Sequence, residues 1–234
     1  MENSEYRRGV IRPVECVKEG WELIKGEYWL LFAITLVGGI IGGATLHLLL
    51  GSMICGITYC YLKKIDGGRV EFDGLWKGFQ WLLPGFVVML VIVVPMIVVY
   101  AIIYFPILMA VIMGPKLDQE EFMMMLLGAV FFDVIFIIIM VCLHTLLMFA
   151  FPLIVDRGLG AGPAMMTSAK AVFGNLGGVA GLLGVNTVLA IVGQLALCVG
   201  IYFVIPVMLA GQLVAYRKIF PARAADNYTP PYTY

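Results

Sequence analysis

The chain has 234 residues, of which 62% are hydrophobic and 13% charged, and its mean hydropathy is +1.00. A soluble domain carries about 45–50% apolar and about 25% charged residues, so this composition excludes a soluble enzyme, a secreted disulfide scaffold and a disordered chain. The 15 basic and 15 acidic residues cancel, so no net field attracts nucleic acid. We therefore expect a multi-pass membrane protein.

The first 26 residues are polar and charged and do not resemble a cleavable signal peptide. The apolar run that starts at Tyr28 is then the expected insertion signal. The cysteines are scattered and form no CxxC pair, which indicates packing residues rather than a disulfide or zinc framework. They are Cys16, Cys55, Cys60, Cys142 and Cys198.

Apolar runs cover residues 28–62, 82–110, 122–154 and 176–216. Because a helix rises about 1.5 Å per residue and the hydrocarbon core is about 30 Å thick, the first and last runs are too long for one span each. Dividing both predicts an all-α integral membrane bundle of six transmembrane helices, at 28–44, 48–62, 82–105, 122–150, 176–193 and 197–216. The second of these is short, and the sequence leaves open whether it spans or re-enters.

The basic residues predict the orientation, because cytoplasmic loops collect Lys and Arg. With six spans and both termini in the cytoplasm, every basic residue except Lys116 lies on the inner side. We expect a cell (inner) membrane protein with a cytoplasmic segment at 1–27, a transmembrane domain at 28–220 and a disordered cytoplasmic tail at 221–234.

Short amphipathic segments are expected at the inner membrane surface. Val14, Val17, Trp21 and Ile24 share one face of a helix over 13–27, which lies either on the inner leaflet or on the protein's own loops. Residues 72–80 and 163–175 form two more such segments, and each follows a turn with an Asp and a Gly, at 65–68 and 155–158. This shared order is compatible with a duplication, a question that the sequence leaves open.

Glycines are the candidate helix-packing residues, because helix backbones approach closely where side chains are small. The pairs at a spacing of four are Gly38 with Gly42, Gly39 with Gly43, and Gly177 with Gly181. Their contacts lie either within the chain, the favoured alternative, or in a homo-oligomer or with a partner subunit. Pro84, Pro95 and Pro106 recur on one face of the third span, and Pro95 is expected to kink it.

Asp133 and His144 lie in the fourth predicted span and share a face, about 16 Å apart along the axis. Ionisable groups are costly in lipid, so they form either a polar path for protons or cations, or two neutral groups. The second alternative is favoured, with Asp133 bonded to a neighbour such as Asn186, Thr187 or Tyr202. Motifs of metalloproteases, serine hydrolases and nucleotide-binding enzymes are missing, so we expect no enzyme, no metal and no cofactor.

One stretch carries a recognisable pattern, FAFPLIVDRGLGAGPAMMTSAKAVFGNLGG from Phe149, followed downstream by Ile205-Pro206 and Ala215-Tyr216-Arg217. It resembles bacterial polytopic membrane proteins of the DUF975 and YciC-like type, and is similar to the membrane domain of some glycerophosphodiester phosphodiesterases. The resemblance implies an inner-membrane bundle and brings no reaction. The polar members of the pattern are the inner-face residues Asp156, Ser168, Lys170 and Asn175, and helix capping is the favoured role for Asp156.

The leading hypothesis is a scaffold or accessory subunit of a membrane complex, which associates through its glycine faces. The alternative is a component of a small-solute, proton-coupled or lipid transporter. The expected partners are membrane lipids and either further copies of the chain or other membrane subunits, and no nucleic acid is expected.

Overall fold

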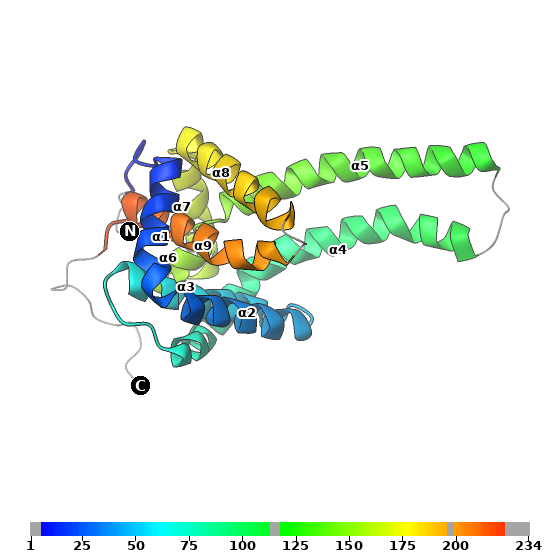
Figure 1. Cartoon of the computed structure of the whole chain (residues 1–234). Helices are drawn as coiled ribbons and strands as arrows, with labels where there is room; N and C mark the ends of the chain where they lie inside the picture. The colour runs from blue at the N-terminus through cyan, green and yellow to red at the C-terminus, as the bar shows by residue number, and fades with distance from the viewer. Residues whose placement is uncertain (1–5, 113–117, 196–198, 223–234) are drawn as a thin grey trace. The chain divides into compact units, whose positions relative to one another are not determined.

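The computed structural model describes residues 6–112, 118–195 and 199–222, and this part of the chain is helical without any strand (Figure 1). The all-α prediction is therefore confirmed. Lys116, Cys198 and the predicted tail from residue 223 lie outside the described residues. The chain forms two compact units, a core unit of Met1–Val88 with Leu146–Tyr234 and a two-helix unit of Met89–Thr145.

The helices begin close to the predicted positions because apolar runs define them. In chain order they are α1 (Pro13–Ile24), the 3-10 helix η1 (Lys25–Glu27), α2 (Tyr28–Ala44), α3 (Leu50–Ile65), the 3-10 helix η2 (Phe72–Trp81), α4 (Leu82–Ile112), α5 (Gln119–Leu146), α6 (Ala150–Arg157), α7 (Ala161–Phe173), α8 (Leu176–Leu195) and α9 (Gly200–Ile219).

Five segments of the described residues are long and apolar enough to cross a membrane. They are Pro13–Ala44, Phe72–Met109, Gln119–Arg157, Leu176–Leu195 and Gly200–Ile219. The predicted second span corresponds to α3, whose 16 residues make it too short to count among these five segments.

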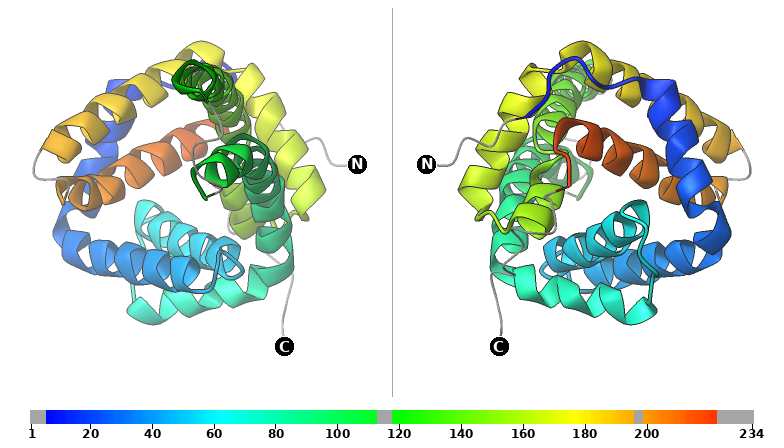
Figure 2. Two further views of the ribbon diagram at one scale, coloured as in Figure 1. Left: turned by 90° about the vertical axis from the view of Figure 1, so that its right-hand side faces the viewer. Right: turned by 90° about the vertical axis from the view of Figure 1, so that its left-hand side faces the viewer.

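Helix α3 lies at the centre of the core unit, packed against α2, η2, α6 and α9. Both views of Figure 2 show η2 running alongside it. Met53, Cys55, Cys60 and Tyr61 on α3 are almost fully buried. Because small and polar residues alternate with apolar ones along this helix, most of its surface suits contact with other helices.

Glycines bring the backbones of α3 and η2 together. A Cβ added to Gly56 would collide with the carbonyl oxygen of Leu75, and one added to Gly78 would collide with that of Ser52. The Cα–H groups of both glycines therefore point at carbonyl oxygens of the neighbouring helix, the geometry of a weak C–H···O hydrogen bond. A 3-10 helix of ten residues is unusual. The close backbone contacts with α3 at Gly56 and Gly78 stabilise it.

The first helix packs on a helix of the same chain. A Cβ on Gly20 of α1 would lie only 2.7 Å from the backbone nitrogen of Gly211 in α9. Cys16 and Ile24 are buried, whereas Val14 and Trp21 remain exposed. The buried face of α1, with Cys16, Gly20 and Ile24, thus packs on α9 and differs from the predicted apolar face, of which Val14 and Trp21 stay exposed.

Candidate functional site

A charged cluster lies at three helix ends of the core unit and is formed by Asp66, Asp156, Arg157, Tyr216 and Arg217. Asp66 follows the last residue of α3, Asp156 lies in the last turn of α6, and Arg217 lies in the last turn of α9. The guanidinium of Arg217 donates from Nε and Nη2 to both oxygens of Asp66, at 2.9 and 2.6 Å. The same Nη2 lies 2.8 Å from Oδ1 of Asp156.

Other members of the cluster hold Asp156 from the opposite side. Tyr216 donates its hydroxyl to Oδ2 of Asp156 at 2.7 Å, and Arg157 donates Nε to the same oxygen at 3.1 Å. Arg157 also donates to the carbonyl oxygen of Pro221 at 2.8 Å. The side chains of Asp156 and Arg217 are only 14% and 13% exposed. Each charge is therefore stabilised by the opposite charge beside it rather than by water.

The cluster also suits the electrostatics of the helices that carry it. The C-terminus of a helix carries a partial negative charge, which cations stabilise. Arg157 and Arg217 occupy the last turns of α6 and α9. The arrangement therefore ties three helix ends together, and its carboxylates are occupied by hydrogen bonds rather than free to act as a base.

Ser168 closes the break between α5 and α6. Its hydroxyl donates to the carbonyl oxygen of Leu146 at 2.6 Å and accepts a hydrogen bond from the amide of Phe149 at 3.1 Å. Because Ser168 is fully buried, this hydroxyl replaces the helical hydrogen bonds that the break interrupts. A structural role follows for this predicted inner-face residue.

Asn175 holds the segment that precedes α1. Its Oδ1 accepts from the amide of Gly9 at 2.7 Å, and its Nδ2 donates to the carbonyl oxygens of Arg7 and Ala171 at 3.1 and 2.9 Å. The amide of Arg7 in turn donates to the carbonyl oxygen of Ile219 at 3.0 Å. Lys170, the remaining inner-face residue, is exposed and takes no part in these contacts.

The predicted glycine pairs divide between contact and open space. A Cβ on Gly38 would lie 2.9 Å from Ile57, and one on Gly42 would lie 2.5 Å from Leu50, so this pair packs on α3. Gly181 similarly faces Pro13 at 2.6 Å. The added Cβ would have no neighbour within 4 Å at Gly39, Gly43 and Gly177.

In the two-helix unit, Asp133 has a different partner from those expected. The hydroxyl of Tyr104 on α4 donates to its Oδ2 at 2.6 Å, in place of a bond to Asn186, Thr187 or Tyr202. Its Oδ1 is shielded and has no hydrogen-bond partner in the described part of the chain. His144 lies three turns further along α5 and is exposed.

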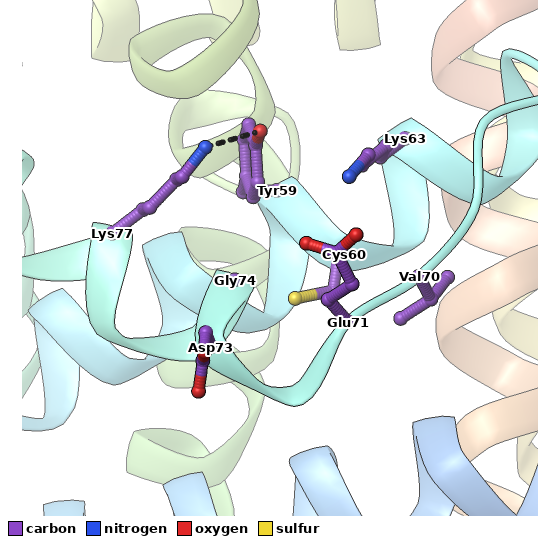
Figure 3. Close-up of a pocket in the computed structure, with 8 residues that line it drawn as sticks. All are labelled: Tyr59, Cys60, Lys63, Val70, Glu71, Asp73, Gly74 and Lys77. Atoms are coloured by element: carbon purple, nitrogen blue, oxygen red, sulfur yellow. Dashed lines mark hydrogen bonds between the residues drawn. The ribbon is translucent and has the colours of Figure 1, made fainter.

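A small cleft between α3 and η2, with the residues just before η2, also gathers charged groups (Figure 3). Lys77 donates to the hydroxyl of Tyr59 at 3.0 Å, and Lys63 and Glu71 line the same cleft beside Cys60. Its volume is about 40 Å³, room for about one water molecule, so it does not fit an organic substrate. Among the described residues, no group of three His, Cys, Asp or Glu side chains could hold a metal ion.

Sequence reasoning missed the central member of the charged cluster. Arg217 and Asp66 are 151 residues apart, and only the two Asp-containing turns and the Tyr216-Arg217 pair offered a signal. Comparison of the chain with family models, curated proteins and solved structures gave no match.

Proposed function

We propose that this chain is a multi-pass protein of a bacterial inner membrane, without catalytic chemistry of its own, that serves as a scaffold or accessory subunit of a membrane complex. Five helical segments of the described residues are long and apolar enough to cross a membrane, which supports an integral membrane protein. The inner-face residues Asp156, Ser168 and Asn175 are engaged in structural hydrogen bonds, which supports a role other than catalysis.

The observation that carries the proposal is the unpacked surface of the two-helix unit. Among its described residues only Met89 and Phe136 are buried. The helices touch through Tyr100 and Phe136, whose ring centroids are 5.9 Å apart, and through the bond between Tyr104 and Asp133. Without a hydrophobic effect in lipid, helices associate by close packing and polar contacts. Two helices of 31 and 28 residues with so little mutual contact are suited to pack on helices of another subunit.

Topology belongs to the same proposal. We place both termini in the cytoplasm, because this orientation keeps the basic residues other than Lys116 inside. The resemblance to the DUF975 and YciC-like proteins points to the same compartment. Since the α2–α3 pair returns the chain to the side where it started, whether or not it crosses fully, the orientation of the later helices does not depend on it.

The test is blue-native electrophoresis after mild solubilisation, with mass spectrometry of the co-purifying proteins. Val134 and Ile138 lie one turn apart on an exposed face of α5, and changing both to Trp blocks close approach there. Val188→Trp with Val192→Trp on the exposed face of α8 is the matched control. We expect a defined complex that only the α5 variant dissociates. A lone monomer for the unaltered chain, or equal behaviour of the two variants, contradicts the proposal.

One observation favours transport as a second candidate function. The shielded, unpartnered Oδ1 of Asp133 lies within an apolar unit, where ionisable groups are often functional. If Asp133 carries protons, Asp133→Asn abolishes dye-reported proton flux in proteoliposomes, although the amide oxygen still accepts from Tyr104. Equal flux with and without the change rejects this candidate.

A further inference from the structure

The core unit contains an open apolar groove between α2, α3 and α9. Its volume is about 400 Å³. The lining includes Phe32, Leu36 and Ile40 of α2, Ile54 and Ile57 of α3, and Ile205 of α9. Leu36 and Ile40 are 37% and 60% exposed, so the groove opens onto the apolar surface of the unit.

A single glycine gives the groove its room. Gly39 lines it, and a Cβ added there would meet nothing within 4 Å. Gly38, one position before it, and Gly42, three positions after it, pack tightly against Ile57 and Leu50 of α3. One face of the glycine-rich half of α2, with Gly38 and Gly42, therefore packs on α3. The adjacent face, with Gly39, leaves the space of the groove open.

The groove offers almost no polar group to a ligand. Thr35 lines it, but its hydroxyl donates to the carbonyl oxygen of Leu31 at 2.7 Å and lies 3.0 Å from the hydroxyl of Tyr61. Tyr202 is the other polar lining residue. A polar solute needs several well-placed partners, so the lining selects an apolar occupant.

Size separates the apolar occupants from one another. A helix is about 10 Å across and rises about 1.5 Å per residue, so this volume would hold only about three residues of a partner helix. An acyl chain is only one methylene wide, so a single chain fits a groove of this volume.

One end of the groove carries the aromatic residues of a membrane interface. The ring of Phe32 stacks on that of Phe203 with centroids 4.9 Å apart, and Trp29 contacts Phe203 edge-on at 6.2 Å. Tyr28 donates to the carbonyl oxygen of Phe203 at 2.6 Å. Trp29 remains 68% exposed. Trp and Tyr favour the level of lipid head groups, so this end marks where a head group would lie.

From these observations we infer that the groove between α2, α3 and α9 binds one acyl chain of a bilayer phospholipid. The head group lies beside Trp29, and the chain runs along α2 past Gly39 towards Leu50. The inference is separate from the scaffold proposal, because it concerns a lipid held by the core unit and not a contact made by the two-helix unit.

The test uses vesicles of phosphatidylethanolamine and phosphatidylglycerol that contain a phospholipid with a photoreactive diazirine in its acyl chain. After illumination of the reconstituted full chain, labelled peptides are identified by mass spectrometry. We expect labels to concentrate on the groove residues of α2, α3 and α9, above those on the exposed Val188 and Val192 of α8. Equal labelling of both surfaces overturns the inference, since it indicates only surrounding lipid.

Two variants make the test specific. Gly39→Phe fills the groove without a clash at Cβ, whereas Gly43→Phe adds the same ring one turn away at another open position. We expect Gly39→Phe to reduce groove labelling about tenfold or more, because overpacking a filled site is costly, and Gly43→Phe to leave it unchanged. If Gly39→Phe labels like the unaltered chain, or if both variants lose the label equally, the assignment to this groove is wrong. The labelling pattern of the unaltered chain decides the question independently of either variant's stability.

Discussion

Arg217 is the residue on which two distant aspartates depend. Its guanidinium bonds to Asp66 at the end of α3 and to Asp156 at the end of α6. Such a buried ion pair adds little net stability. Removing one partner is nevertheless costly, because the other charge then stays in a poorly hydrated place without a partner.

Replacing Arg217 with Met should destabilise the core unit by about 3–5 kcal/mol, the usual cost of removing one partner from a buried ion pair. Thermal unfolding in detergent micelles measures the loss. Lys170→Met removes an exposed cation from α7 and serves as control, with an expected change within about 0.5 kcal/mol. Equal midpoints for both variants would show that the charged cluster does not hold the helix ends together.

At the residue scale the sequence singled out residues where a signal is local, although Asp156 bonds to the side chains of Arg157, Tyr216 and Arg217 rather than capping a helix as expected. The polar pattern from Phe149 singled out Asp156, Ser168 and Asn175, and the structure gives all three structural hydrogen bonds. The sequence did not predict the role of Arg217, because that role depends on which helix ends meet in the folded chain. For Asp133 the side chain alone could not tell that Tyr104, rather than a residue of α8 or α9, would be its partner.

At the scale of elements, hydropathy locates helices well and their packing poorly. Helices α2 and α8 begin at the predicted residues, Tyr28 and Leu176. The same signal did not show that α3 is surrounded by other helices, because its burial follows from neighbours distant in the sequence. It also singled out Gly38 and Gly42 but overlooked Gly56 and Gly78, which lie on different elements and form no fixed spacing.

The contact between α3 and η2 predicts a sharp contrast among glycines. Gly56→Ala and Gly78→Ala each place a Cβ against a backbone carbonyl oxygen, so we expect losses of about 2 kcal/mol or more. Gly39→Ala meets open space, and better helix propensity should make it neutral or stabilising by up to about 1 kcal/mol. Thermal unfolding of the three variants in one detergent measures this order, and a reversed order would refute the packing described for η2.

At the scale of the whole molecule, the apolar runs sufficed to predict a helical chain with several segments apolar enough to cross a membrane, but not its division into units. The two Asp-containing turns meet at Arg217, yet the segments that follow them differ. One is the 3-10 helix η2 and the other the α-helix α7. The equivalence of the two halves that a duplication would produce is therefore weak at the level of secondary structure.

The lengths of α2 and α3 bear on whether this helix pair crosses the membrane or re-enters it. Taken alone, their 17 and 16 residues measure about 26 and 24 Å, less than the roughly 30 Å of the hydrocarbon core. The longer segment Pro13–Ala44 would suffice to cross, but its first part, α1, packs along α9 through Gly20 and Gly211. We expect the α2–α3 pair to re-enter rather than cross, so that the turn at Leu46 and His47 stays within the membrane.

Cysteine labelling of intact cells tests this depth. In a background without native cysteines, Glu120→Cys at the start of α5 should react with a membrane-impermeant maleimide. Arg69→Cys should react only after permeabilisation, and His47→Cys should resist labelling in both conditions. External labelling of His47→Cys would show a full crossing instead, and external labelling of Arg69→Cys would overturn the orientation.

The hydrogen bonds that join the segment before α1 to Asn175 and to Ile219 have a consequence for synthesis. The ribosome makes Arg7 and Gly9 early, whereas the acceptor at Ile219 is made only after α9 has been translated. Until then the early segment can bond only to Asn175. A nascent chain that ends before α9 therefore lacks one of the two anchors of this segment, and the Arg7–Ile219 bond can form only after α9 has been made.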